Sequence, residues 1–151
     1  MIASAIVKKI SSAEVLSLRH LILKPHLTID QCVLQEDELE TTFHTGIFYF
    51  EKLVSVATFM RQSHPHFKAR LPFRLRGMAT AEKHQRQGFG AMAIRNGIVC
   101  LEQMNCDFLW FNAREKAIGF YEKFGFQIFG PVFDIQGIGP HKVMYKALNP
   151  R

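Results

Sequence analysis

The most specific chemistry in this sequence lies in a glycine-rich turn, Gln-Arg-Gln-Gly-Phe-Gly at residues 85–90. The turn follows a strand-like stretch and leads into an amphipathic helix, and glycines at such a junction let a ligand approach the backbone closely. The first helical turn offers unpaired N–H groups and the positive end of the helix dipole. Lys83, His84 and Arg86 add basic side chains. Together these features predict a cradle for a pyrophosphate group.

A second group of residues with useful chemistry lies further along the chain. Asn112 follows a short apolar strand, and Tyr121 lies on the helix that comes next. The Tyr121 phenol can donate a proton, and Asn112 can bind a ligand or cap the helix. A structural role is the alternative for Tyr121, because a tyrosine on an apolar helical face usually belongs to the core. That face also carries Ala117, Phe120 and Phe124.

Two arginines, Arg74 and Arg76, alternate along the strand-like residues 73–81. If their face of the strand lines a binding site, they favour a substrate with a carboxylate or a phosphate. The alternative is a solvated or ion-paired strand face. The histidines and cysteines lack the spacing of metal ligands, so no metal is predicted.

These residues must be positioned by elements that alternate between strand and helix. Ser11 and Glu14 have the spacing of a capping box and begin a first helix, which Pro25 ends. The acidic run at residues 36–40 is interpreted as solvated. The first helix is expected to bury an apolar face formed by Val15, Leu18, Leu21 and Ile22. Strands are predicted over residues 1–10, 41–50, 53–62, 73–81, 107–113, 126–133 and 142–148, and further helices over residues 88–104 and 114–124.

The composition indicates one globular domain, predicted to span residues 1–151. Hydrophobic residues make up 48% of the chain and the net charge is +6, which favours an anionic partner or is simply a soluble basic surface. Three cysteines without metal or Cys-x-x-Cys spacing indicate reduced thiols and a cytoplasmic location. A signal-peptide pattern and a membrane-length apolar run are both missing, so no membrane association is expected.

The order of the elements and two motifs resembles the GNAT superfamily of acyl-CoA-dependent N-acetyltransferases. The superfamily's cofactor loop, [Arg/Gln]-x-x-Gly-x-[Gly/Ala], is matched by Gln85, Gly88 and Gly90. Its second motif places an Asn after the fifth strand, then a small residue, a Tyr and Gly-Phe. The matching residues are Asn112, Ala117, Tyr121, Gly125 and Phe126. The resemblance implies an α/β (α+β) fold: a mixed, mostly antiparallel sheet flanked by helices, with the cofactor in a central splay between strands.

The resemblance also implies a role for each motif in binding acetyl-CoA as co-substrate. A bulge near Met78 would aim a backbone N–H at the thioester carbonyl and stabilise the oxyanion. Tyr121 would protonate the leaving thiolate. The strand backbone at Met78, Ala79 and Thr80 would pair with the pantetheine arm, helped by Asn112 and Ala117. The pyrophosphate would be bound by Gln85, Arg86, Gln87, Gly88, Phe89 and Gly90.

The general base is the point at which the sequence departs from well-known members, many of which place a Glu within the fourth strand. Residues 73–81 contain no carboxylate, and Glu82 follows immediately. His141 is another candidate, as is a water chain to a backbone carbonyl. His141 ends a Gly-Ile-Gly-Pro-His turn that resembles a Gly-Ile-Pro-His segment in a subset of the superfamily, with Gly139 added.

The sequence therefore predicts direct transfer of an acetyl group from acetyl-CoA to a primary amine of a small molecule or peptide. A non-catalytic acyl-CoA-binding sensor is the first alternative, because the strand carboxylate is missing. A basic nucleic-acid-binding module is the second. The sequence has no clustered basic helix and no basic-aromatic stacking pattern, so no nucleic-acid partner is expected. The phenylalanine-rich closing strands could pair two copies into a homodimer.

Overall fold

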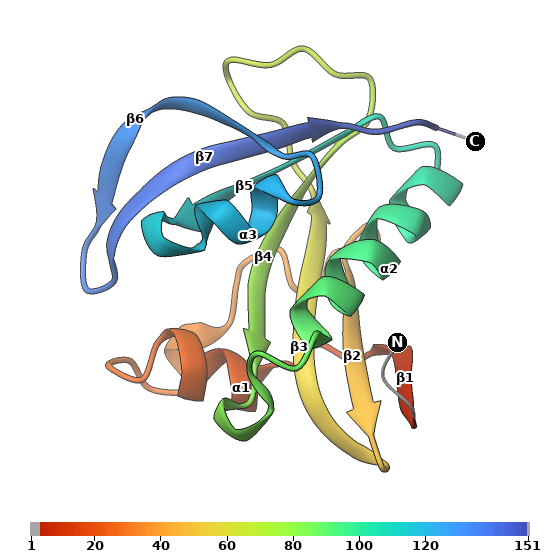
Figure 1. Cartoon of the computed structure of the whole chain (residues 1–151), viewed down its shortest axis with the longest axis vertical. Helices are drawn as coiled ribbons and strands as arrows, with labels where there is room; N and C mark the ends of the chain where they lie inside the picture. The colour runs from red at the N-terminus through yellow and green to blue at the C-terminus, as the bar shows by residue number, and fades with distance from the viewer. Residues whose placement is uncertain (1–3, 151) are drawn as a thin grey trace. The chain divides into compact units, whose positions relative to one another are not determined.

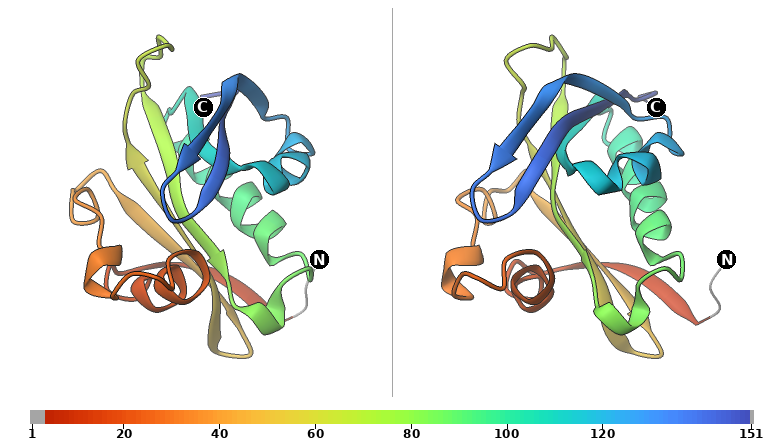
Figure 2. Two further views of the ribbon diagram at one scale, coloured as in Figure 1. Left: turned by 90° about the vertical axis from the view of Figure 1, so that its left-hand side faces the viewer. Right: turned by 60° about the vertical axis from the view of Figure 1, so that its left-hand side comes forward.

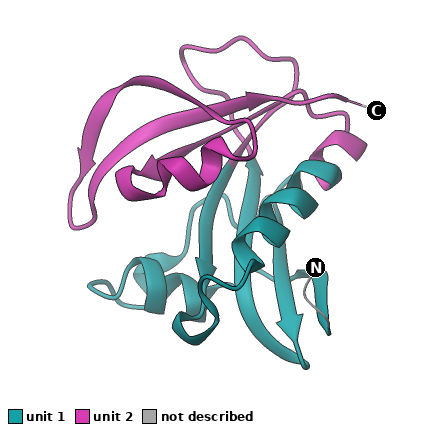
Figure 3. Ribbon diagram, in the orientation of Figure 1, with its two compact units in different colours: residues 1–60, 75–99 teal, residues 61–74, 100–151 magenta. Residues whose placement is uncertain are grey.

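The computed structural model describes residues 4–150, so the first three residues of the predicted first strand lie outside the described part. The chain divides into two compact units, and each is assembled from two stretches of sequence (Figure 3). Unit 1 comprises residues 1–60 and 75–99, and unit 2 comprises residues 61–74 and 100–151. The expectation of a single domain for the whole chain stays a prediction.

Within residues 4–150, seven strands form one sheet: β1 (Ala5–Ile10), β2 (Phe43–Tyr49), β3 (Lys52–Arg61), β4 (Pro72–Thr80), β5 (Phe108–Arg114), β6 (Gln127–Ile135) and β7 (Gly139–Ala147). Their order is β1-β2-β3-β4-β5-β7-β6 (Figure 1). β4 pairs with β5 in parallel, whereas β1–β2, β2–β3, β5–β7 and β6–β7 are antiparallel. The predicted mixed, mostly antiparallel sheet is therefore confirmed.

The strands predicted over residues 41–50 and 53–62 form the hairpin of β2 and β3, and its turn lies one residue earlier than the gap between the two predicted ranges. Phe50 and Glu51 both have a left-handed φ, of 48° and 67°. Two such residues in succession are typical of the tight turn whose twist matches that of the flanking strands. Tyr49 consequently pairs with Lys52, which begins β3.

The predicted capping box forms, but the first helix begins later than predicted, at Leu16, with Val15 as its N-cap residue. The Ser11 hydroxyl accepts a hydrogen bond from the Glu14 N–H at 3.3 Å, and the Glu14 carboxylate accepts one from the Ser11 N–H at 2.9 Å. This is the reciprocal pairing of a capping box. The short helix α1 (Leu16–Leu18) then continues directly into a π-helix, η1 (Arg19–Leu23), which ends before Pro25.

The π-helical segment makes part of the predicted apolar face wrong. A π-helix bonds residue i to residue i+5, so positions after Leu18 are rotated relative to an α-helix. Leu21, predicted to be buried, is 63% exposed, whereas Arg19 is 1% exposed. Val15 and Leu18 lie in the core as predicted. A pattern with the period of an α-helix therefore placed Val15 and Leu18 correctly in the core and failed for Leu21.

Two helices cover opposite faces of the unit 1 strands, as the views in Figures 1 and 2 show. The first is α1, and the second is α2 (Phe89–Gln103), which matches the helix predicted over residues 88–104. Each helix packs on its own buried cluster: Val15, Leu18, Val56 and Ala79 under α1, and Ile47, Val54, Phe89 and Ala93 under α2. In the part of the chain that is described, no helix combines the length and apolar character needed to cross a membrane.

Unit 2 is built on β5, β7 and β6, with the first residues of β4 alongside β5. The helix predicted over residues 114–124 is shorter than expected, because β5 extends to Arg114. A 3-10 turn, η4 (Glu115–Ala117), and a short helix, α3 (Ile118–Glu122), follow. The C-cap residue of α3 is Lys123, and Gly125, with a φ of 87°, turns the chain into β6 two residues later.

Candidate functional site

The predicted cradle is a turn with two left-handed residues at the start of α2. A 3-10 turn, η3 (Glu82–His84), leads into it. Arg86 has a φ of 63° and Gly88 a φ of 93°. A left-handed arginine is uncommon, and such conformations are found preferentially at ligand sites. Turns of this kind can aim successive N–H groups to one side and form an anion-binding concavity.

Two glutamine side chains brace the cradle from within. Gln85 Nε2 donates to the Thr80 carbonyl at 3.0 Å, and Gln87 Nε2 donates to the Lys83 carbonyl at 3.3 Å. These bonds hold the turn in shape, and the ligand contacts predicted for it stay a prediction. The sequence had marked Gln85 as a motif position without indicating that its side chain binds the chain itself.

The backbone at the start of α2 is available to a ligand. The Gly88 carbonyl accepts the N–H of Met92 at 3.0 Å, so the first helical turn follows Gly88 directly. The N–H groups of that turn have no acceptor within the helix. Residues 85–88 are exposed, whereas Phe89 is 1% exposed. Phe89 therefore anchors the cradle in the core with its side chain and leaves its N–H at the open end of the helix.

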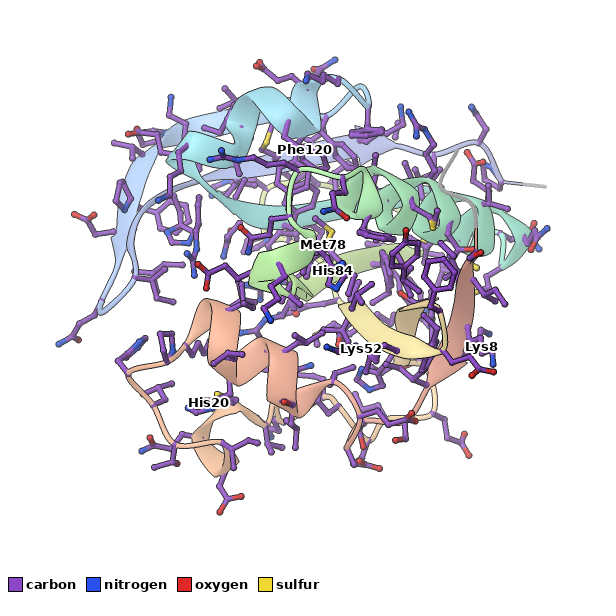
Figure 4. The ribbon with its side chains drawn as sticks, turned by 60° about the horizontal axis from the view of Figure 1, so that its bottom comes forward. Lys8, His20, Lys52, Met78, His84 and Phe120 are labelled. Carbon is purple, nitrogen blue, oxygen red and sulfur yellow. The ribbon has the colours of Figure 1, made fainter. Side chains whose placement is uncertain are left out.

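A cluster of aromatic side chains packs against the residues that lead into and out of the cradle. The His84 ring meets the rings of Tyr49 and Phe89 edge-on, with centroids 5.9 Å and 6.0 Å apart. Nδ1 of His84 is buried and has no hydrogen-bond partner among the described residues. Met78 packs against the same cluster, and Figure 4 labels both Met78 and His84. The group ties η3, β2, β4 and α2 together behind the turn.

The end of β4 holds the residues predicted to pair with the pantetheine arm. Met78 packs on the α2 cluster, and Ala79 is buried in the α1 cluster. Ser55 Oγ donates to the Ala79 carbonyl at 3.3 Å and lies 2.9 Å from Thr80 Oγ1. The buried Ser55 hydroxyl thus fixes the conformation of β4 just before the cradle.

β4 is irregular immediately before Met78. Gly77 has a φ of 60°, far from strand values, and this left-handed position interrupts the alternation of side chains. A β-carbon at position 77 would lie 2.8 Å from Nε of Arg19. The neighbouring Arg76 faces the acidic run, with its Nη1 3.9 Å from Glu36 Oε1. The irregularity lies where the sequence predicted a bulge near Met78.

Arg19 is the centre of a buried polar network that the sequence did not indicate. Its Nη1 donates to Asp37 Oδ2 at 2.8 Å and to the Cys32 carbonyl at 2.9 Å, and its Nη2 donates to Asp37 Oδ1 at 3.1 Å and to Thr58 Oγ1 at 2.8 Å. His44 lies 2.8 Å from Thr58 Oγ1 and 3.0 Å from the Asp37 carbonyl. Asp37, expected to be solvated within its acidic run, is 4% exposed.

Replacing Gly77 with alanine is expected to lower the free energy of unfolding by about 1–3 kcal/mol. The new β-carbon would require a left-handed alanine and would contact the locked Arg19 guanidinium. Urea unfolding of the variant measures the loss. A Gly119→Ala variant is the control, because a β-carbon there meets no atom within 4 Å. Equal stability of the two variants would contradict the strain assigned to position 77.

Arg74 and Arg76 lie in different surroundings and different units. The Arg74 guanidinium lies 4.6 Å from the centroid of the Trp110 ring, and its Nη1 is 3.4 Å from the Gln62 side chain. Arg76 lies near Glu36, with 3.9 Å between Nη1 and Oε1. Burial lowers the pKa of Arg76, and the nearby Glu36 carboxylate opposes that effect. The predicted substrate role of both arginines stays a prediction.

In unit 2, Asn112 lies within β5, opposite Val143 of β7. The alternative that it caps the following helix is wrong, because β5 extends two residues further and Arg114 precedes η4. Ala117 directly precedes α3, as the N-cap residue without a side-chain cap. The ligand roles predicted for Asn112 and Ala117 stay predictions.

Tyr121 packs against Phe111 of β5 and against Phe126, the residue before β6. Its ring centroid is 4.4 Å from that of Phe111 and 6.2 Å from that of Phe126. Burial raises the pKa of the Tyr121 phenol to about 12, and the positive charge of Arg114 opposes the rise. Tyr121 is therefore held as a neutral phenol, which is a hydrogen-bond donor, over the whole physiological pH range.

The two candidate bases differ in exposure. His141 is 4% exposed and lies in β7, paired with Arg114 and Phe133, so its expected place in a turn is wrong. β7 begins at Gly139, and the His141 Nδ1 lies 2.8 Å from the Gly139 carbonyl. Glu82 is exposed and begins η3. Either role as general base stays a prediction.

The comparison with protein families gives one match that spans most of the chain. The family described as "Acetyltransferase (GNAT) family" matches residues 16–126. A protein of Bacillus subtilis (strain 168) described as "Uncharacterized N-acetyltransferase YitI" is 43% identical to this chain over 142 residues, which cover 94% of this chain and 95% of YitI.

Solved structures share the same fold at low sequence identity. A putative N-acetyltransferase from Lactobacillus plantarum superposes with a TM-score of 0.78 at 15% identity, over 96% of this chain and 99% of that one. ElaA of Escherichia coli superposes with a TM-score of 0.75 at 17% identity, over 94% of this chain and 99% of that one.

Proposed function

Since this chain belongs to the GNAT acetyltransferase family, we propose that it transfers an acetyl group from acetyl-CoA directly to a primary amine of a small molecule or peptide. The observation that carries the proposal is the braced turn at residues 85–90, whose left-handed Arg86 and Gly88 lead into the open start of α2. Backbone donors at a helix start suit the pyrophosphate of the co-substrate.

Each step of the proposed reaction is assigned to a group of this chain. The backbone N–H near Met78 stabilises the negative charge that develops on the thioester oxygen. Tyr121 donates its phenolic proton to the sulfur as the carbon–sulfur bond breaks. The amine must lose a proton to form the amide, and Glu82, His141 or a water chain is proposed to accept it.

Titration of the protein with acetyl-CoA tests the cradle, and a Gly88→Trp variant is expected to lose at least 100-fold in affinity. The bulky side chain would fill the turn at a position whose φ of 93° already disfavours any residue except glycine. Isothermal titration calorimetry gives both dissociation constants. The matched control is Gly119→Trp, because Gly119 is exposed and a β-carbon there meets no atom within 4 Å. If the wild-type protein does not bind acetyl-CoA, the proposal is contradicted.

A non-catalytic acyl-CoA sensor is the second candidate, and the composition of β4 favours it. β4 reads Pro-Phe-Arg-Leu-Arg-Gly-Met-Ala-Thr and carries no carboxylate to act as a base. Binding of acetyl-CoA without release of thiol across a broad panel of amines would support the sensor. A cytoplasmic location and a homodimer remain predictions under either function.

A further inference from the structure

Unit 1 holds a second group of charges beside the irregular part of β4, and its cations outnumber its carboxylates. The cations are Arg19, Lys24 and Arg76, and the carboxylates are Glu36 and Asp37. Asp37 is fully engaged by Arg19, with two bonds at 2.8 Å and 3.1 Å. This leaves Glu36 as the carboxylate that faces Arg76, while, in the described part of the chain, the only carboxylate charge acting on Lys24 is that of the already paired Asp37.

The remaining pairing is weak. Arg76 Nη1 lies 3.9 Å from Glu36, beyond the distance of a charge-assisted hydrogen bond. The side chains of Arg76 and Glu36 are 28% and 31% exposed, so both are open to solvent on one side. Within the described residues, Lys24 has no carboxylate within 4.0 Å. Burial lowers the pKa of Lys24, and the charge of Arg76 lowers it further.

The backbone positions of Lys24 and Arg76 are fixed by the elements that carry them. Lys24 ends η1, and its N–H donates to the His20 carbonyl at 3.2 Å. The neighbouring Leu23 packs on the cluster that contains Ala79 of β4. Arg76 belongs to β4 itself, two residues before Met78. An arginine fork beside a lysine suits the planar or tetrahedral oxygens of a carboxylate or phosphate.

We propose that Arg76 and Lys24 form a subsite for a carboxylate or phosphate group on the acceptor molecule, with Glu36 as the counter-ion that the acceptor displaces. The inference rests on the proposed acetyl transfer and adds the class of acceptor: a small amine that also carries an anionic group. Two residues along a strand lie about 6–7 Å apart. Anchoring at Arg76 would therefore hold a small acceptor close to the Met78 backbone, where the thioester is proposed to react.

The test is an NMR titration of the full chain with inorganic phosphate and, separately, with acetate at constant ionic strength. We expect saturable binding of at least one anion, weakened at least tenfold in Arg76→Gln and in Lys24→Gln. The control is Lys52→Gln, which removes the same charge from an exposed position of unit 1 (labelled in Figure 4) and should change the dissociation constant less than twofold. Absence of saturable binding, or equal weakening in all three variants, overturns the subsite.

Acceptor pairs then distinguish the two sources of the anion. O-phosphoethanolamine is compared with ethanolamine, and β-alanine with propylamine, using acetyl-CoA and thiol release. The anionic member of one pair should have a kcat/KM at least tenfold higher, and Arg76→Gln should remove that preference through KM. Equal kcat/KM within both pairs overturns the proposal. If the wild-type protein binds acetyl-CoA but neither anion, the subsite alone fails; if it binds an anion but no acetyl-CoA, the proposed function fails and the acceptor assignment with it.

Discussion

Replacing Arg19 with methionine is expected to destabilise the protein by about 3–5 kcal/mol. The variant removes four hydrogen bonds and leaves the Asp37 carboxylate, 4% exposed, without its counter-ion. For a chain of this length the loss corresponds to a fall of roughly 10 °C in Tm. Urea unfolding and a thermal melt measure it. An Arg61→Met variant, at an exposed position, is the control and should lose less than about 0.5 kcal/mol.

Two further measurements separate a buried ion pair from simple loss of packing. The double variant Arg19→Met, Asp37→Leu should regain part of the stability, because an apolar pair of similar volume can replace a buried ion pair. Burial opposes ionisation of Asp37, but hydrogen bonds from Arg19 and from the Leu34 N–H prevail and hold the pKa of the carboxyl below its ordinary value. The pair therefore stabilises the wild-type protein above about pH 4, and this contribution is lost as the pH falls through the lowered pKa. If the difference in unfolding free energy between the wild-type protein and the Arg19→Met variant stays constant below pH 4, this assignment is contradicted.

Replacing Tyr121 with phenylalanine is expected to lower kcat by about 100-fold to 10,000-fold, the usual contribution of a general acid. Binding of acetyl-CoA should change little, because only the hydroxyl is lost and the ring still packs on Phe111. Steady-state kinetics and calorimetry measure the two quantities. The control is Tyr145→Phe, which removes a phenol that donates to the Gln127 side chain at 2.9 Å. Full turnover by the Tyr121 variant would remove this residue from the mechanism.

The pH dependence of kcat offers an independent check on Tyr121. Because burial raises the pKa of its phenol to about 12, the proton-donating form persists as the pH rises. The wild-type protein should therefore show no loss of kcat caused by Tyr121 between pH 7 and pH 10. A fall in kcat with a midpoint near pH 10, absent in the phenylalanine variant, would indicate an ordinary phenol and argue against its burial.

The parts of the fold and site that could be predicted are those with local causes. The turn at residues 85–90, the helix that follows it and the left-handed Gly125 before β6 follow from glycine positions and helical periodicity within a few residues. The capping box of Ser11 and Glu14 spans four residues and is predictable for the same reason. Such signals are complete in the sequence because the interacting groups are neighbours along the chain.

The parts that could not be predicted depend on contacts between distant residues. Arg19 and Asp37 are 18 positions apart. Asp37 was expected to be solvated within its acidic run, and no local pattern marks Arg19 as its partner. Arg19 begins the π-helical segment, and all of its side-chain hydrogen bonds are to residues at least 13 positions away. His141 was expected in a turn because it follows two glycines and a proline. Its place in β7 depends on pairing with the distant strands β5 and β6, which local sequence does not reveal. Arg74 and Arg76 appeared equivalent, yet one stacks on Trp110 and the other approaches Glu36.

The buried cysteines make it possible to measure the opening of each unit by itself. Cys32 belongs to unit 1 and Cys106 to unit 2, and both are fully buried as free thiols. A thiol reagent can reach each sulfur only when its surroundings open. Burial also raises the pKa of the Cys106 thiol, so the reactive thiolate forms there only after exposure. Labelling rates followed by mass spectrometry would thus report two separate opening equilibria. Acetyl-CoA should slow the labelling of the cysteine in the unit that it stabilises.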